Sequence, residues 1–317
     1  MAVQVNEAKE QSNIRFVTSG GITWMDIEDP TPKDIEFLRG HYPFHPLDLD
    51  DCLSRIQLPK VDDYEEYVFL ILHFPVFRQE VRQTVASQVS VFLGSNYLVT
   101  LHQKELRPVG EFFQQSEASE EVRQDNMTRG TGYLLYRIVD RLVDYWFPML
   151  TNLLERMDLV EDKVFDETVE MGAAVALLRR DLIKQRRISW PMRDIAQTLG
   201  LKLQRFTAED MTVYFGDIVD HINKIWHTLD ELREVIEVYK DTDYTLGTER
   251  VNAVLRVLTV IFTVLLPFMV TSGIYGMNVV LPGGLVEGSL WTFSAVMALS
   301  LLSTGVMLYY FRRKRWI

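Results

Sequence analysis

The sequence predicts an α+β cytoplasmic domain with long helices, which continue into a two-span α-helical membrane domain. Three observations lead to this fold class. Runs rich in β-branched and aromatic residues are concentrated before residue 105, a helical pattern extends without a break from Met211 to Tyr275, and two apolar runs lie near the C-terminus. A chain of 317 residues is long enough for one to three domains.

Residues 1–129 are predicted to form a mixed α/β domain. Five segments have the pattern of a regular element, and we expect strands in the first and the last two and helices in the others: Ile14–Ile27, Thr31–His41, Leu47–Leu53, Tyr67–Val76 and Gln88–Leu101. The first segment contains a Gly-Gly turn, and the first helix begins with Thr-Pro, a common helix start.

Residues 130–206 are predicted to form an antiparallel pair of helices. Tyr133–Phe165 and Thr168–Leu199 place apolar residues at steps of three and four, with charged residues between them, which is typical of amphipathic helices. The two helices would be joined near Asp166. Nothing in this pair indicates catalysis.

Residues 207–278 are predicted to form a stalk helix that ends in the first membrane span, at about 256–277. Its apolar residues alternate steps of four and three, which is typical of a seam that packs helix against helix: Met211, Phe215, Ile218, Ile222, Ile225, Leu229, Leu232, Ile236 and Tyr239. A neighbouring polar stripe, mostly acidic, repeats every seven residues from Asp217 to Asn252. This stripe is either a regulatory surface or merely the solvated face of the helix.

Two apolar runs predict the membrane domain. No charged residue occurs between Arg256 and Glu287, and a bilayer core about 30 Å thick is crossed by about 20 mainly apolar residues of helix. The run breaks at Pro282 and resumes at Leu290. After the first span we therefore expect an outer loop at 279–289, a second span at 290–311 and a basic tail at 312–317.

The distribution of charge predicts the topology. The expected outer loop has no Lys or Arg, whereas Arg250, Arg256 and the basic tail flank the spans. The positive-inside bias therefore places both termini in the cytoplasm and the protein in the cell (plasma or inner) membrane. The net charge of −11, with most acids before the spans, argues against nucleic acid as a partner. Cys52 is the only cysteine, so no disulfide framework or cysteine-based zinc site is expected.

One face of the first span mixes polar, small and flexible apolar residues. Such a face suits a water-filled path between helices, although tight helix packing also selects threonine and small residues. The candidate pore-lining and gate residues are Asn252, Leu255, Leu258, Thr259, Thr263, Leu266, Met269 and Gly273. Among them, Leu255, Leu258 and Leu266 could form a hydrophobic constriction that gates by excluding water.

The end of the first span carries the sequence Tyr275-Gly276-Met277-Asn278. Together with Asn252 about one helix length before it, Pro267 within the span and the basic C-terminal segment, this signature resembles the CorA family of magnesium channels. The run from His45 to Leu72 is also similar to the cytoplasmic domain of that family. The resemblance implies a funnel-shaped homopentamer in membrane lipid that passes Mg²⁺ and Co²⁺, with Ni²⁺ as a further candidate.

The resemblance implies a selectivity filter at Gly276, Met277 and Asn278. Mg²⁺ gives up its water reluctantly, so a pore can recognise the hydrated ion. The amide oxygen of Asn278 can accept hydrogen bonds from metal-bound water. The segment Val279–Gly284 contains no acidic residue, unlike many family members, and this leaves an outer acidic ring in doubt.

The resemblance also implies regulation by cytoplasmic Mg²⁺ at carboxylates between subunits. Asp51 and Asp217 match one regulatory site of the family, and Asp50 and Asp140 match a second. Mg²⁺ would thus be both the transported ion and the regulatory ion, and no organic cofactor is expected.

Two other functions remain open from the sequence. One is a zinc transporter of the same superfamily, although no His/Cys cluster supports zinc. The other is a membrane-anchored scaffold without transport. An enzyme is not expected, because the sequence has no nucleophile elbow, phosphate-binding loop or zinc motif.

Overall fold

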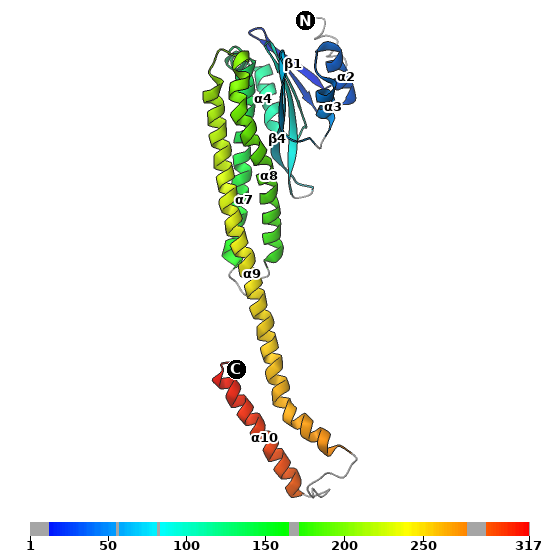
Figure 1. The fold of residues 1–317 in the computed structure, drawn as a ribbon, viewed down its shortest axis with the longest axis vertical. Helices are drawn as coiled ribbons and strands as arrows, with labels where there is room; N and C mark the ends of the chain where they lie inside the picture. Colours follow the sequence, from blue (N-terminus) through cyan, green and yellow to red (C-terminus); the bar gives the residue numbers. More distant parts are fainter. Residues whose placement is uncertain (1–12, 55–56, 81–82, 165–170, 278–289, 317) are drawn as a thin grey trace. The chain divides into compact units, whose positions relative to one another are not determined.

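The computed structural model describes residues 13–54, 57–80, 83–164, 171–277 and 290–316. Two compact units divide this part of the chain. The first contains the sheet and the helices up to Lys240, and the second contains the chain from Asp241 onward. Figure 1 shows the elements of both units.

The first unit is built on a six-stranded sheet with the strand order β1-β2-β6-β5-β4-β3. β2 and β6 are parallel neighbours, and every other pair is antiparallel. The strands are β1 (Ile14–Ser19), β2 (Ile22–Glu28), β3 (Lys60–Asp63), β4 (Tyr67–Arg78), β5 (Gln83–Gly94) and β6 (Tyr97–His102). The α+β fold class is therefore confirmed.

The strand predicted at Gln88–Leu101 was wrong in its extent. The structure forms β5 and β6 there, joined by a tight turn at Ser95 and Asn96. Gly, Ser and Asn are turn-forming residues, and two residues suffice to connect antiparallel strands. The sequence pattern of strand-forming residues on both sides concealed this hairpin.

Helices cover both faces of the sheet (Figure 1). α2 (Pro32–His41) and α3 (Pro46–Leu53) pack on one face through a core that includes Leu38, Leu49 and Phe92. α4 (Arg107–Ala118) packs on the other face, where Phe112 and Phe113 contact Trp24 at ring centroid distances of 5.3 and 5.0 Å. The helix predicted to follow Thr31 is confirmed, with a capping box between Thr31 and Asp34.

The helical part of this unit follows the sheet in sequence. Its elements are α5 (Glu120–Met127), α6 (Thr131–Asp144), α7 (Trp146–Val164), α8 (Gly172–Lys202), the 3₁₀ turn η1 (Leu203–Phe206) and the start of α9 (Met211–Tyr275).

The first helix of the predicted pair is not continuous, because α6 ends at Asp144 and α7 begins at Trp146. Pro148 explains the interruption: it has no N–H to bond the Asp144 carbonyl, and its ring crowds that carbonyl. The second predicted helix corresponds to α8, which begins at Gly172; the residues 165–170 at the predicted junction lie outside the described part of the chain.

The uninterrupted helix α9 and its seam are confirmed. The nine predicted seam residues, from Met211 to Tyr239, are all buried. Aromatic pairs mark the neighbours of the seam: Phe215 contacts Tyr136 of α6, and Trp226 contacts Trp190 of α8. The seam therefore fixes which side of α9 faces the helices of the first unit.

The second unit consists of the end of α9 and α10 (Leu290–Arg313). Both helices are long and apolar enough to cross a membrane. The hydroxyl of Ser300 in α10 donates to that of Thr271 in α9 at 3.5 Å, and Thr304 donates to the carbonyl of Val264 at 3.4 Å. These contacts show which face of α9 is covered by α10.

A buried ionic network ties β1, β2 and β6 together. Asp26 is fully buried and accepts a hydrogen bond from Thr100 at 2.7 Å; Arg15 lies 2.5 Å from it and His102 Nε2 lies 3.2 Å from it. Burial alone would lower the pKa of His102, but the hydrogen bond and negative charge of Asp26, with a smaller effect of Glu28, hold that pKa above its ordinary value.

The pKa of Asp26 is shifted the other way. Burial alone would raise it, but the hydrogen bond and charge of His102, with Thr100 and Arg15, hold it below its ordinary value. The His102 contribution to stability is therefore complete below about pH 6.5 and is lost as the pH rises through the raised pKa. The Asp26 contribution is complete above about pH 3.9 and is lost as the pH falls through the lowered pKa.

We predict that His102→Gln lowers the melting temperature more at pH 6 than at pH 9, because only the protonated imidazole gains from Asp26. Each unit by which the pKa is raised corresponds to about 1.4 kcal/mol in the free energy of unfolding. A change of about 1 kcal/mol shifts the melting temperature of a domain of this size by about 2–4 °C. Thermal unfolding of the purified protein at both pH values measures this. The exposed His227→Gln is the control, and an equal loss at both pH values for His102→Gln would contradict the assignment.

Candidate functional site

The start of α6 is held against the start of α9. Gly130 has a positive φ of 111° and forms a β-bridge with Thr207, just before α9. A Cβ atom at this glycine would lie 2.7 Å from the Phe206 carbonyl oxygen, so a larger residue does not fit. This close approach sets α6 beside α9 and thereby brings acidic residues of the two helices together.

Asp140 and Asp144 of α6 lie beside His221 of α9. Each side chain offers one potential metal-ligand atom, and these three atoms all lie within 4.8 Å of one another. Asp140 and His221 are partly buried, and Asp144 is exposed. The Nδ1 atom of His221 is buried and has no hydrogen-bond partner in the described part of the chain. Two carboxylates and a free imidazole nitrogen form a donor set that suits a divalent cation.

Nearby positive charge compensates the carboxylates of this cluster only in part. Burial, followed by the charge of Asp144, raises the pKa of Asp140; Asp217 on α9 adds to the increase, and Arg137 and His221 only partly oppose it. A raised carboxyl pKa means that the ionised form is disfavoured, and a bound cation would relieve this. The structure thus groups Asp140 with Asp217, which the sequence analysis assigned to separate sites.

Asp50 and Asp51 lie on α3, and both have cationic partners within the chain. Asp51 pairs with Lys60 at 2.8 Å and accepts a hydrogen bond from Gln57 at 2.7 Å. The exposed Asp50 lies 3.5 Å from Arg39. Lys60 also lies 2.6 Å from Asp62 and 3.8 Å from Asp48, so its single charge is shared among three carboxylates and only partly compensates Asp51.

Asp144 and His221 were not predicted from the sequence. Both lie four residues beyond a predicted ligand, Asp144 after Asp140 and His221 after Asp217. Residues four apart share one helix face, so this spacing was a signal that could have found them.

The predicted pore-lining stripe lies on the side of α9 opposite to α10. At about 100° per residue, Leu266 is rotated by about 200° from Val264, which contacts α10. The same rotation places Thr259 and Gly273, seven residues before and after Leu266, on the uncovered side. In the single chain the side chains of the stripe are exposed, except that of Thr263, which is partly exposed.

Threonine hydroxyls give this stripe its polarity. Thr259 donates to the Leu255 carbonyl at 2.7 Å, and Thr263 donates to the Thr259 carbonyl at 2.7 Å. Because each hydroxyl hydrogen is used within the helix, the oxygen lone pairs remain as acceptors for water. Such acceptors match the hydrogen atoms that a hydrated cation presents.

α9 ends at Tyr275, the first residue of the signature. The N–H of Gly276 still bonds to the Ser272 carbonyl at 2.9 Å, and that of Met277 bonds to the Ile274 carbonyl at 3.3 Å, a tighter turn. The helical pattern of hydrogen bonds therefore continues for two residues beyond Tyr275, to Met277. Asn278, the predicted selectivity residue, lies outside the described residues.

Comparisons with known proteins agree over nearly the whole chain. The protein YfjQ of Bacillus subtilis is 30% identical over 297 residues, which cover 92% of this chain and 89% of that protein. The cobalt/magnesium transport protein CorA of Thermotoga maritima is 28% identical over 315 residues, covering 97% and 87%.

The solved structure of the CorA magnesium transporter from Methanocaldococcus jannaschii has the same fold. It superposes with a TM-score of 0.76 at 24% identity and covers 96% of this chain and 94% of that one. The family described as CorA-like Mg²⁺ transporter protein matches residues 19–313. The chain therefore belongs to the CorA family of divalent cation transporters.

Proposed function

We propose that the protein is a homopentameric channel for Mg²⁺ that also passes Co²⁺, with Ni²⁺ as a further permeant ion. The relatives named cobalt/magnesium transport proteins support this choice of ions. Zinc transport proteins are also similar to this chain, but at only 20–21% identity. The choice of Mg²⁺ over Zn²⁺ is thus testable by ion competition.

The uncovered polar stripe of α9 is the observation that carries the proposal. Thr259, Leu266 and Gly273 face away from α10. One helix face cannot enclose a path for an ion, so the stripes of several copies must converge on a common axis. The fivefold number follows from the resemblance to the family.

In this channel the ion keeps its water while it is selected. A ring of Asn278 amide oxygens accepts hydrogen bonds from the first hydration shell, and removal of water from Mg²⁺ is avoided. Gly276 lets the chain turn at the helix end with its carbonyls exposed. Deeper in the pore, Leu255, Leu258 and Leu266 form the constriction that stops conduction by excluding water.

The driving force is the concentration gradient together with the membrane potential. A divalent cation gains about 4.6 kcal/mol per 100 mV, twice the value for a single charge. This direction of transport requires the pore mouth at Asn278 to lie outside and both termini to lie in the cytoplasm of a cell with an inward gradient. The basic residues flanking the two spans support that orientation.

Cytoplasmic Mg²⁺ closes the channel by binding carboxylates. Asp140, Asp144 and Asp217 supply carboxylate donors on α6 and α9, and His221 adds an imidazole. Asp51 would reach Asp217 of a neighbouring copy, and its pairing with Lys60 must then loosen. A bound ion relieves the repulsion and holds the subunits in the closed arrangement, with a coupling of about 1–3 kcal/mol per linked pair of sites.

We predict that Asn278→Ala abolishes Mg²⁺ flux into liposomes while the protein still assembles, because the ring of water-binding amides is lost. The measurement is uptake reported by a trapped Mg²⁺ indicator, repeated with Co²⁺ and Zn²⁺ as competitors. The exposed Asn152→Ala on α7 is the matched control and should retain wild-type flux. Wild-type flux in Asn278→Ala would contradict the assignment of Asn278 as the selectivity residue. Stronger block by Zn²⁺ than by Co²⁺ would favour the alternative that the protein transports zinc.

A second prediction concerns assembly. The purified protein in detergent should have a mass of five chains, since the stripe needs partners around a common axis. Native mass spectrometry measures this directly. A monomer that retains flux would contradict the pore proposal.

A third prediction concerns regulation. The double variant Asp51→Asn with Asp217→Asn should weaken inhibition by internal Mg²⁺ without changing ion preference, because it removes the repulsion and the bridging ligands together. The measurement is flux as internal Mg²⁺ is raised. The exposed pair Glu65→Gln with Glu155→Gln removes the same charge elsewhere and should leave the inhibition curve unchanged. An unchanged curve in the Asp51/Asp217 variant would show that these carboxylates are not the sensor.

A further inference from the structure

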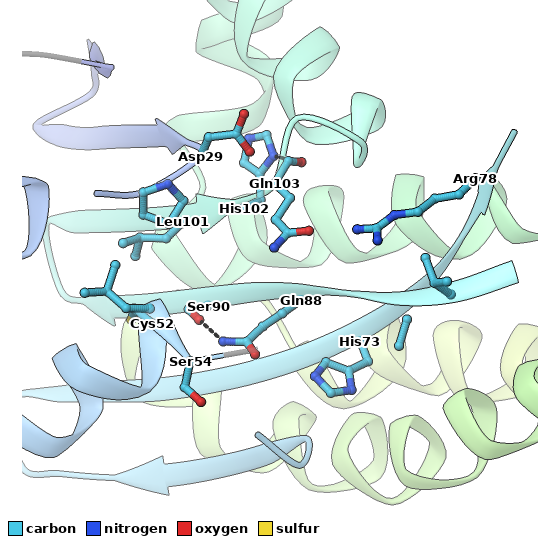
Figure 2. A pocket seen from close by; sticks show the side chains of 14 residues that line it. Asp29, Cys52, Ser54, His73, Arg78, Gln88, Ser90, Leu101, His102 and Gln103 are labelled. Atoms are coloured by element: carbon cyan, nitrogen blue, oxygen red, sulfur yellow. Dashed lines mark hydrogen bonds between the residues drawn. The ribbon is translucent and has the colours of Figure 1, made fainter. Parts of the chain in front are cut away.

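A polar cavity in the first unit takes no part in the transport proposal. It has a volume of about 560 Å³. Figure 2 shows that it lies beside the strands of the sheet, with side chains from several elements directed toward it. His73, Gln88 and Ser90 come from β4 and β5, on the face that α2 and α3 cover elsewhere. The cavity thus occupies the part of this sheet face that lies beyond the end of α3.

The cavity opens at the carboxyl ends of two parallel strands. Asp29 directly follows β2, Gln103 directly follows β6, and both line the cavity. Open sheets bind ligands in crevices at the carboxyl ends of parallel strands. Asp29 is held in place here: its N–H donates to the His102 carbonyl at 2.8 Å, and its carboxylate accepts from the Lys104 N–H at 3.0 Å.

Asp29 and Arg78 place opposite charges at separate positions on the cavity wall. Figure 2 shows Asp29 and Arg78 well apart, with Gln103 between them. Glu105 holds Nε and Nη2 of Arg78 at 2.9 and 3.0 Å, which leaves Nη1 without a hydrogen bond in the described part of the chain. The wall therefore offers an acceptor for a cationic group at one place and a donor for an anionic group at another.

Uncharged polar groups line the space between these charges. Burial lowers the pKa of His73, so its imidazole is neutral near pH 7 and can donate or accept. Gln88, Ser90 and Gln103 add amide and hydroxyl groups, and Leu101 and Ala86 add apolar surface. Amide-binding groups together with small apolar surfaces match a peptide backbone with small side chains.

The cavity is also connected to the end of α3. Gln88 Nε2 donates to the Asp51 carbonyl at 3.1 Å and to the Ser90 hydroxyl at 2.9 Å. Cys52 and Leu53, the next residues of α3, line the cavity. A ligand that contacts Gln88 thus acts on the helix that carries Asp50 and Asp51.

We propose that this cavity is a regulatory site for a small zwitterion of the short-peptide class, with its carboxylate at Arg78 and its ammonium group at Asp29. Occupancy changes the Mg²⁺ dependence of the channel through Gln88 and α3. The coupling rests on the proposed role of Asp51 in Mg²⁺ sensing, whereas the binding does not.

Binding is tested by calorimetry on the full-length protein in detergent, with tri-alanine, N-acetyl-tri-alanine and tri-alanine amide as probes. Tri-alanine should bind, and blocking either charged end should weaken binding by at least about tenfold, the value of one charge-assisted hydrogen bond. Arg78→Gln should abolish the difference between the acid and the amide. Asp29→Asn should abolish the difference between the free and acetylated amines, and asparagine tolerates the positive φ of 51° at this position.

Two variants separate binding from folding. Ala86→Phe fills the cavity without a change of charge and should block all three probes, whereas Gln79→Ala, outside the lining, should change nothing. No binding of tri-alanine to the wild type, equal binding of the three probes, or full binding to Ala86→Phe would each overturn the site.

Coupling is tested by the Mg²⁺ inhibition curve of the reconstituted channel with and without tri-alanine. The midpoint should shift by at least about threefold, within the usual range of coupling energies, and the shift should be absent in Ala86→Phe. An unchanged midpoint with intact binding would overturn the coupling alone. Absence of Mg²⁺ flux from the wild type, with intact binding, would contradict the proposed function and leave the binding site supported.

Discussion

A polar face of a membrane helix must be shielded from lipid, and this requirement constrains how the membrane domain can assemble. Polar groups exposed to hydrocarbon cost several kcal/mol each when they lack partners. α10 covers only the side of α9 that carries Val264 and Thr271. The stripe through Thr259 and Gly273 lies on the other side, where no described residue of the chain covers it. The threonine hydroxyl hydrogens of this stripe are bonded within α9. In the proposed channel their oxygen lone pairs face water that several copies of the chain enclose.

The acidic cluster of the first unit poses a similar requirement. Asp140 lies near Asp144 and Asp217, and burial, followed by repulsion from these charges, raises its pKa. Asp51 differs because it has a direct ion pair with Lys60, which it shares with Asp62. In the proposed regulation, a divalent cation would bind the carboxylates of α6 and α9 first. In the proposed channel, regulation and conduction would use the same ion at sites of different chemistry.

The sequence predicted best those features that depend on one helix alone. All nine seam residues of α9 are buried, because a regular apolar repeat over many turns has only one packing solution. The break between α6 and α7 was missed, although Pro148 marked it, because the apolar pattern continues across it.

Features that depend on contacts between distant segments could not be predicted in this way. His221 meets Asp140 and Asp144 only because Gly130 sets α6 beside α9. The cavity at Gln88 requires the register that pairs it with His73 and the parallel pairing of β2 with β6. Neither the register nor the parallel pairing follows from the composition of the strands, because both depend on how segments far apart in sequence come together.

Cysteine accessibility tests the central claim most directly, because Cys52 is the only cysteine and is buried. The measurement is Mg²⁺ flux before and after a cationic thiol reagent, in channels with Thr259→Cys or Leu266→Cys, compared with Val264→Cys or Phe268→Cys. The account predicts block of the first pair, whose side chains face the pore, and unchanged flux in the second pair. Equal effects on both pairs, or block of the second pair alone, would contradict it.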